Sequence, residues 1–211
     1  NVKAEEYSRF NNISIEDGLS QATVETMMQD SKGYIWLGTN DGLDRYNGYT
    51  FKKYSYEKGQ ENSLVNGYIL DIKEDSEGNI WVDTAAGISK IYNNGEKVQN
   101  YTSDSESGNL SNDNTATMLI SSSNKIYVGT AEGINLYDKK TDKFNLIYPE
   151  LKEEYVNSLA EDKYGNIWAG TENGLYKINV VTNAIERFES TDDVNTISEN
   201  YIYKVYYDGD K

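Results

Sequence analysis

The sequence predicts an all-β fold made of β-propeller blades, each with four antiparallel strands. The first observation is a stretch of 14 residues that recurs, with its aromatic anchor at positions 36, 81, 127 and 168 and hence at intervals of 45, 46 and 41 residues. A period in this range indicates stacked supersecondary units. The second observation is that Gly-containing turns separate short apolar runs in every copy, which favours hairpins over the helix pairs of a solenoid. The copies occupy residues 30–43, 75–88, 121–134 and 162–175.

The segment ahead of each copy is predicted to be the first strand of a blade. Its two apolar positions stand six and three residues before the turn, a spacing that resembles one face of a helix. The segments are only eight or nine residues long, have no helix caps and end in turn residues. We therefore expect strands with a local irregularity such as a β-bulge. The paired positions are Val24 and Met27, Ile69 and Ile72, Thr115 and Met118, Val156 and Leu159, and Ile202 and Val205.

Three further strands complete each predicted blade. An Asp-x-x-Gly turn comes first, in which Asp accepts backbone N–H groups and Gly adopts a positive φ. Ser121 and Asn124 take these two places in the third repeat. The second strand is apolar on both faces, which predicts a neighbouring sheet on each side. A second Gly-ended turn leads into the third strand, and the fourth strands are expected at Phe51 and Tyr54, Val98 and Tyr101, Phe144 and Ile147, and Ile185 and Phe188.

The predicted blades form one incomplete propeller segment over residues 1–211. Tyr7 and Phe10 have the spacing of a fourth strand, and Tyr201 to Asp208 resembles the innermost strand of a fifth blade. Both end blades would lack strands, so the ring is expected to stay open. Open ends expose apolar faces and unpaired strand edges, which predicts self-association through the propeller ends. The four full blades are expected at about residues 20–56, 63–103, 110–148 and 151–190, with partial blades at 1–14 and 196–211.

Composition excludes several classes of function. The 35 acidic and 20 basic residues give a net charge of −15, which disfavours nucleic acid and anionic membrane surfaces as partners. The chain contains neither His nor Cys, so disulfides, zinc fingers and His-dependent triads are excluded. We therefore expect no catalytic residues, no cofactor and no metal site. No run of about 18 apolar residues occurs, and the start at Asn1 without Met suggests a processed or excised segment.

The conspicuous residues of the repeat are interpreted as architecture. Asp30, Asp75 and Asp162 recur once per blade, so turn chemistry explains them better than shared acid–base catalysis. The Gly-Thr-x-x-Gly loops lack a following helix or Lys and are interpreted as hairpins rather than phosphate sites. The acidic runs 104–106 and 192–193 lack the alternating spacing of a calcium loop. Packing between blades, rather than sugar stacking, is expected for Trp36, Trp81 and Trp168.

Topology indicates a better candidate site at one rim of the propeller. Because antiparallel strands alternate in direction, the loop that enters each blade and the loop between its second and third strands lie on the same rim. The residue just ahead of each first strand would then surround the mouth of the channel. We predict a ligand-binding collar of Tyr68, Asn114, Tyr155 and Tyr201, suited to stacking on a sugar or a peptide. Thr23 has the same place in the first blade, and chance is the alternative, since the chain has 19 Tyr.

The repeat resembles the two-component regulator propeller family. The shared pattern is Val-x-x-Met-x-x-Asp-x-x-Gly-x-Ile-Trp-x-Gly-Thr-x-x-Gly-Leu-x-x-Tyr followed by an aromatic strand, and the copies around Trp36 and Trp168 match it most closely. Asp83 replaces a Gly and Tyr127 replaces a Trp in the other copies. The resemblance covers nearly the whole chain. It implies the extracytoplasmic sensor region of a hybrid two-component protein, a histidine kinase or a diguanylate cyclase receptor.

The resemblance further implies a non-catalytic segment that senses an unknown extracellular ligand and has no direct contact with the membrane. Two alternatives remain. A propeller enzyme, such as a polysaccharide lyase or glycosidase, would need a Tyr–Arg cluster or an unrepeated acid pair at the axis, and the only Arg residues are Arg9, Arg45 and Arg187. A purely structural module for protein interaction is the other alternative. The departures Asp83 and Tyr127 are expected to be informative, together with the unrepeated loops.

Overall fold

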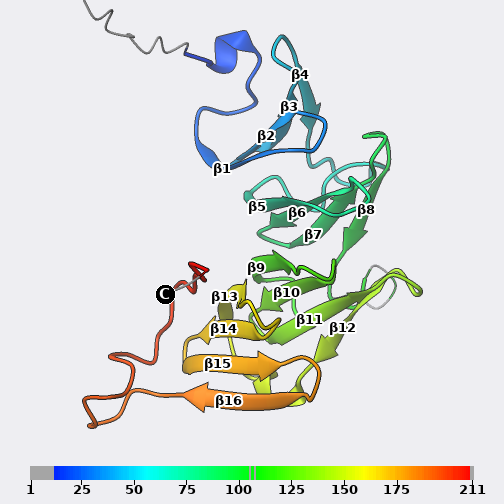
Figure 1. Ribbon diagram of the computed structural model, residues 1–211. Coiled ribbons are helices and arrows are strands. Elements are labelled where there is room, and N and C mark those ends of the chain that lie inside the picture. The colour runs from blue at the N-terminus through cyan, green and yellow to red at the C-terminus, as the bar shows by residue number, and fades with distance from the viewer. Residues whose placement is uncertain (1–11, 105, 107, 210–211) are drawn as a thin grey trace, which may run out of the picture.

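The computed structural model describes residues 12–104, 106 and 108–209, and within them it confirms four sheets of four antiparallel strands. The sheets follow one another along the chain in an open arc, with the first strand of each on the inner side (Figure 1). Two short 3-10 helices, η1 (Ile15–Asp17) and η2 (Pro149–Leu151), lie outside the sheets. The strands are β1 (Val24–Gln29), β2 (Ile35–Thr39), β3 (Gly42–Tyr46), β4 (Phe51–Tyr54), β5 (Ile69–Glu74), β6 (Ile80–Thr84), β7 (Gly87–Ile91), β8 (Val98–Tyr101), β9 (Thr115–Ile120), β10 (Ile126–Thr130), β11 (Gly133–Asp138), β12 (Lys143–Ile147), β13 (Val156–Glu161), β14 (Ile167–Thr171), β15 (Gly174–Asn179) and β16 (Ala184–Phe188).

The Asp-x-x-Gly turn between the first and second strands forms as predicted. In the first blade, one oxygen of Asp30 accepts the N–H groups of Lys32 and Tyr34 at 3.0 and 2.9 Å. Its other oxygen accepts the indole N–H of Trp36 at 2.8 Å, a bond that the sequence pattern had not disclosed. The turn Asp and the Trp of the same repeat are therefore joined by a hydrogen bond, so each fixes the position of the other. The same bond occurs in two other blades, from Trp81 to Asp75 at 2.8 Å and from Trp168 to Asp162 at 3.0 Å.

Each first strand contains the predicted irregularity. Its register with the second strand shifts by one residue in all four sheets. A bulge of this kind bends the strand and leaves one residue outside the ladder. The unpaired residues are Glu25, Leu70, Ala116 and Asn157.

Glycine allows adjacent blades to approach closely. A Cβ atom placed on Gly38 would lie 2.6 Å from Cγ2 of Ile69, which belongs to the first strand of the next blade. Gly129 has the same relation to Val156, at 2.7 Å. Because no real Cβ tolerates such a distance, the Gly of the Gly-Thr pair is required by contact between blades. Asp83 takes this position in the second blade.

The Gly-Thr-x-x-Gly loops are hairpins, as interpreted from the sequence. Thr39 donates its hydroxyl proton to the carbonyl of Gly42 at 2.8 Å and accepts the N–H of Asp41 at 3.1 Å. The corresponding Thr hydroxyls donate in the same way in the other three blades. The Thr therefore closes the turn between the second and third strands from its own side chain.

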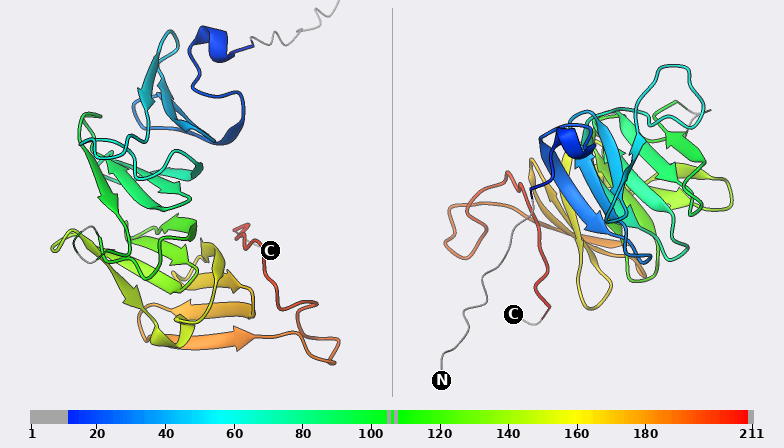
Figure 2. Two further views of the ribbon diagram at one scale, coloured as in Figure 1. Left: turned by 180° about the vertical axis from the view of Figure 1, so that it is seen from behind. Right: turned by 90° about the horizontal axis from the view of Figure 1, so that it is seen from above.

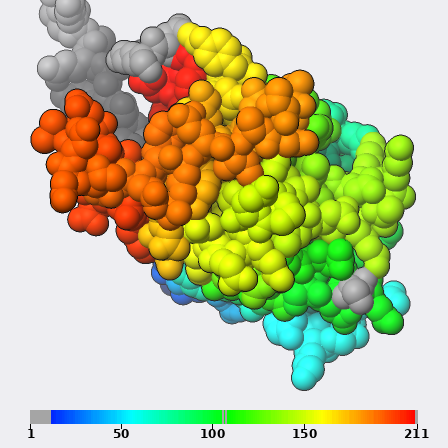
Figure 3. All heavy atoms as spheres, turned by 90° about the horizontal axis from the view of Figure 1, so that it is seen from below, coloured from blue at the N-terminus to red at the C-terminus, as the bar shows by residue number. Residues whose placement is uncertain are grey.

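The apolar core consists of three clusters, and each one joins two successive blades. Trp36 lies in the cluster between blades 1 and 2, and Trp81 in the cluster between blades 2 and 3. Packing between blades is therefore confirmed for both residues. Trp168 is only half-buried, because no described sheet covers the outer face of the fourth blade (Figure 3).

The C-terminal end of the chain does not form the predicted strand, and the N-terminal end lies outside the described residues. Residues 201–208 run beside the inner side of the last sheet, but they form no strand, so the predicted innermost strand of a fifth blade is wrong (Figure 2). The N–H of Ile202 bonds to the carbonyl of Thr171 at 2.8 Å, and the N–H of Val205 bonds to the hydroxyl of Ser158 at 3.0 Å. A ladder needs a paired second strand, which the described residues do not supply here. The predicted strand at positions 7–10 lies outside the described residues.

The same C-terminal segment nevertheless occupies the place of a neighbouring blade. A Cβ on Gly170 would lie 2.6 Å from Cγ2 of Ile202, which repeats the contact of Gly38 with Ile69. The apolar pair Ile202 and Val205, from which the strand was predicted, therefore marks a contact with the preceding blade. Among the described residues, no helix is long and apolar enough to cross a membrane.

Candidate functional site

The loops that were predicted to share one rim do lie together. In blades 2, 3 and 4, the residue that precedes the first strand accepts, through its backbone carbonyl, a hydrogen bond from the loop between the second and third strands of the same blade. This bond ties the two loops of a blade into one edge. The pairs are Tyr68 with Ala85 at 3.1 Å, Asn114 with Ala131 at 2.9 Å, and Tyr155 with Glu172 at 3.3 Å.

A cavity of about 550 Å³ lies on this rim, where blades 2, 3 and 4 meet the C-terminal segment. Three residues of the predicted collar, Asn114, Tyr155 and Tyr201, contribute to its lining. Tyr68 and Thr23 do not. The second blade reaches the cavity through its first strand and its β6–β7 turn, while the first blade lies further along the arc (Figure 1). The structure thus brings together three of the four predicted site residues.

Sequence reasoning missed the bulge residues as part of this site. Leu70, Ala116 and Asn157 are the unpaired residues of three successive first strands, and all three line the cavity. A residue outside the ladder is free to turn toward the axis, which explains why one comes from each blade. The available signal was their position directly after the first apolar residue of each strand.

The cavity offers hydrogen-bonding groups and ring surfaces. The hydroxyl of Tyr155 donates to the side-chain oxygen of Asn114 at 3.2 Å. Tyr201 exposes 51% of its surface. Glu172 and Lys204 add one charge of each sign to the lining. Such a set can hold a polar molecule with a flat face by stacking and hydrogen bonds.

The two described Arg residues, which a Tyr–Arg cluster would need, lie away from this cavity. Arg45 stacks over the ring of Trp36, with 5.6 Å between its Cζ and the ring centre. Arg187 pairs with Glu189 at 2.9 Å. Neither Arg lines the rim cavity, and position 9 lies outside the described residues.

The acidic runs also have local partners. Asp104 accepts the N–H of Glu106, and Asp193 accepts the N–H of Asn195, each at 2.9 Å, as in ordinary turns. Within the described part of the chain, no group of three or more acidic side chains is arranged to hold a metal ion.

Asp83 is the acidic residue in the least ordinary environment. It is fully buried between blades 2 and 3, and neither of its carboxylate oxygens has a hydrogen-bond partner within the described residues. The hydroxyl of Thr115 in the next blade donates instead to the carbonyl of Thr84 at 2.7 Å. Burial raises the pKa of Asp83 to about 7. The carboxylate of Asp71, its partner across the strand pair, adds to the shift, and Lys73 opposes it.

Comparison with known proteins supports the family resemblance. The family model described as "two component regulator propeller" matches residues 18–41, 63–86 and 150–173. The curated protein "Histidine kinase P4" from Formosa agariphila is 40% identical over 55 residues, which are 26% of this chain and 4% of that protein. The match therefore concerns a short part of a much longer protein.

Solved structures show the same fold. The extracellular domain of a hybrid two-component system from B. thetaiotaomicron matches with a TM-score of 0.62 and 18% identity over 93% of this chain, which spans 39% of that domain. Virginiamycin B lyase from Staphylococcus aureus matches with a TM-score of 0.60 and 14% identity over 84% of this chain and 59% of that one. Similarity at this identity concerns architecture only. Three segments of this chain are thus similar to the repeat of the two-component regulator propeller family, and the solved structures agree with it in fold.

Proposed function

We propose that the chain is a non-catalytic, ligand-sensing segment of a signal-transduction receptor and that it works outside the cytoplasm. The family repeats and the fold of an extracellular two-component domain support this assignment. The observation that carries the ligand-sensing part is the rim cavity, because its lining comes from three blades and the C-terminal segment. A ligand held there contacts all of them at once. Its binding energy can therefore shift the positions of the blades relative to one another.

The lining favours a carbohydrate, with a short peptide as the second class. Sugar rings present flat C–H faces to aromatic side chains and hydroxyls to amides and carboxylates. Tyr201 supplies a ring surface, while Asn157 and Glu172 supply an amide and a carboxylate. Asn157 donates to the carbonyl of Ile202 at 3.2 Å, which couples the polar lining to the C-terminal segment.

Calorimetric titration of the purified chain with panels of oligosaccharides and short peptides tests the proposal. We expect Tyr155→Ala to weaken a binding panel member by about tenfold or more, because it removes a ring and the hydroxyl that orients Asn114. Tyr155→Phe should retain the ring and lose less. Tyr164→Ala is the matched control, since Tyr164 is 78% exposed in the turn at the opposite end of β13. Binding that Tyr155→Ala leaves unchanged would contradict the rim site.

An enzymatic function is the second candidate, because a lyase shares the fold. One solved structure of that lyase is described as a catalytically inactive histidine-to-alanine variant. The 211 residues of this chain contain no His, so a reaction of that kind would need a residue from outside them. Turnover of any oligosaccharide or lactone in the same panels would favour the enzyme over the sensor.

The open arc supports a further part of the proposal, which is association through the ends of the propeller. Met27 in the inner strand of the first blade is 70% exposed, and Trp168 in the last blade lacks the full cover that Trp81 has. Burial of these two faces would remove exposed apolar area. Sedimentation velocity at tens of micromolar should show dimers or larger species, and a single monomeric boundary would count against end-to-end association.

A further inference from the structure

Three of the four blades share a set of side chains around the Trp. The Trp donates to the turn Asp, a cationic side chain lies over its face from the third strand, and an aromatic ring from the fourth strand stacks on it. In the first blade the ring centres of Trp36 and Tyr54 are 5.5 Å apart. The sets are Asp30, Trp36, Arg45 and Tyr54; Asp75, Trp81, Lys90 and Tyr101; and Asp162, Trp168, Lys177 and Phe188.

Blade 3 departs from this set at all four positions. The strand registers place Tyr127 opposite Leu136, and Ile134 opposite Ile147, in the pairs where other blades have Trp with a cation and an aliphatic residue with an aromatic ring. Ser121 replaces the turn Asp. Every replacement that faces the next blade has a smaller side-chain volume than the residue it replaces. The interface between blades 3 and 4 is therefore short of side-chain volume.

The fourth-strand position shows where the volume is missing. Tyr54 donates its hydroxyl proton to the carbonyl of Gly95 at 3.0 Å, and Tyr101 donates to Asp142 at 2.6 Å. In both cases the ring spans to a left-handed residue in the turn before the last strand of the next blade. Asn183, with φ 58°, has that place in blade 4. Ile147 has neither the length nor the hydroxyl to reach it.

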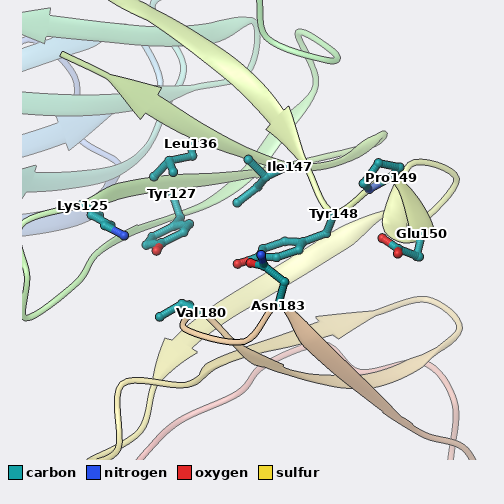
Figure 4. Close-up of a pocket in the computed structure, with 9 residues that line it drawn as sticks. All are labelled: Lys125, Tyr127, Leu136, Ile147, Tyr148, Pro149, Glu150, Val180 and Asn183. Carbon is teal, nitrogen blue, oxygen red and sulfur yellow. The ribbon is translucent and has the colours of Figure 1, made fainter. Parts of the chain in front are cut away.

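A cavity of about 410 Å³ occupies this position. Ile147 and Leu136 form apolar walls, and Val180 closes the opposite side from blade 4. The rings of Tyr127 and Tyr148 extend into the same space, with Asn183 beside Tyr148 (Figure 4). Cavities left by a missing large side chain accept small apolar rings of matching shape.

Two tyrosine hydroxyls and a lysine of the cavity lack side-chain partners within the described residues. The hydroxyls of Tyr127 and Tyr148 have no hydrogen-bond partner within the described residues, and Lys125 forms no ion pair there. Figure 4 shows the amino group of Lys125 on the side of Tyr127, with Glu150 at the far end. Burial raises the pKa of Tyr127 to about 12, so its hydroxyl remains a neutral donor at ordinary pH.

We propose that this cavity binds a small planar aromatic acid. Its ring takes the space that Tyr54 and Tyr101 fill at the other two interfaces, between Ile147 and Val180. Its carboxylate faces Lys125 and the hydroxyl of Tyr127, away from Glu150. A phenolic hydroxyl on the far side of the ring reaches Asn183, as the tyrosine hydroxyls reach the equivalent turns. This site is separate from the rim cavity and does not depend on the proposed sensor function.

Ligand-observed NMR and calorimetry with 4-hydroxyphenylacetate test the proposal directly. We expect binding of this probe, weaker binding of the uncharged 4-methylphenol, and none of the non-planar cyclohexylacetate. Ile147→Tyr should abolish binding because it restores the residue that fills the space in other blades. Tyr127→Trp is a second filling variant, which serves if Ile147→Tyr does not fold.

Charge and location are tested by two further variants. Lys125→Gln should weaken the acid by about tenfold while leaving 4-methylphenol unchanged. Lys58→Gln, an exposed lysine on the loop after β4, is the matched control and should change neither. Tyr155→Ala in the rim cavity should leave the acid bound, so the two sites can fail independently. Absence of binding by 4-hydroxyphenylacetate, or equal binding by a folded filling variant, would overturn the proposal.

Discussion

The interface between blades 2 and 3 and the interface between blades 3 and 4 have the same topology but opposite fillings. In the first, Trp81 lies among three rings, with centre distances of 5.7 Å to Tyr101, 4.8 Å to Tyr137 and 6.1 Å to Phe144. In the second, Tyr127 stacks on no ring within the described residues, and a cavity of about 410 Å³ remains. Strand pairing therefore sets the frame of a blade, whereas side-chain size decides whether an interface is solid or hollow.

The two interfaces also differ at the position of the Gly in the Gly-Thr pair, and here it is the solid interface that departs from the repeat. The solid interface contains Asp83, where three other blades have Gly and the contact is apolar. The hollow interface keeps the Gly, with Gly129 against Val156. The solid interface thus departs from the repeat through an added polar group, and the hollow interface departs through lost side-chain volume.

The largest difference is expected when the central aromatic residue of each interface is truncated. Trp81→Ala should lower the free energy of unfolding by about 5 kcal/mol, because it creates a large cavity and leaves Asp75 without its indole donor. Tyr127→Ala should lower it by only about 2 kcal/mol, since that residue already borders a cavity. Urea unfolding followed by fluorescence measures both. Tyr49→Ala, at a residue 91% exposed, is the control and should stay within about 0.5 kcal/mol. Equal losses for Trp81→Ala and Tyr127→Ala would mean that the cavity collapses in solution.

The next largest effect concerns the pH dependence that Asp83 gives to the solid interface. Its pKa is about 7 in the folded protein and 3.8 in the unfolded reference, so the folded state holds the proton more tightly. This group therefore stabilises the fold most below about pH 4, and the contribution is lost as pH rises to about 7, by at most about 4 kcal/mol. Beyond that pH the contribution stays constant.

Asp83→Asn isolates this effect from those of other carboxylates. Asp75 and Asp162 act in the opposite sense: although burial raises the pKa of each, hydrogen bonds from the indole, the neighbouring Asn and backbone amides lower it below the ordinary value. The difference between wild type and Asp83→Asn in urea titrations should therefore grow from pH 4 to 7 in favour of the variant. Parallel curves over that range would show that Asp83 keeps its charge paired or hydrated in solution.

The smallest effects are expected from two Gly→Ala variants. In one the new Cβ meets residues of a paired strand, and in the other it meets the C-terminal segment, which forms no strand. Gly129→Ala places a Cβ 2.7 Å from both Thr117 and Val156, which are held in sheets, and should reduce the free energy of unfolding by about 3 kcal/mol. Gly170→Ala meets Ile202 at 2.6 Å, but residues 201–208 form no strand and can move away. We expect a loss of about 1 kcal/mol there. A larger loss for Gly170→Ala than for Gly129→Ala would indicate that the C-terminal segment is as firmly held as a blade.

Much of the fold follows from the sequence because its causes are local and repeated. The turn formed by Asp30 and Gly33, the bulge after Val24 and the hairpin closed by Thr39 each depend on a few consecutive residues. The strand predicted at residues 201–208 failed for a non-local reason. Its apolar spacing is that of a first strand, but the ladder partner that would make it a strand is not among the described residues.

The site was only partly predictable for the same reason. The rim positions Asn114, Tyr155 and Tyr201 follow from strand direction alone, and they do meet at one cavity. The cavity between blades 3 and 4 depends on register, because Tyr127 and Leu136 become neighbours only when β10 and β11 pair. The sequence marked Tyr127 as a departure but did not show that its neighbours had changed with it.

The open arc also determines the order in which the molecule comes apart. The first strands contact one another in sequence, β1 with β5, β5 with β9 and β9 with β13, and the arc of the described residues does not close on itself (Figure 1). Stability in such an array is a sum of nearest-neighbour terms, and the terminal units have one neighbour instead of two. Local opening should therefore begin at the outer blades and move inward. Amide hydrogens of β6 and β10 should consequently exchange with solvent more slowly than those of β2 and β14.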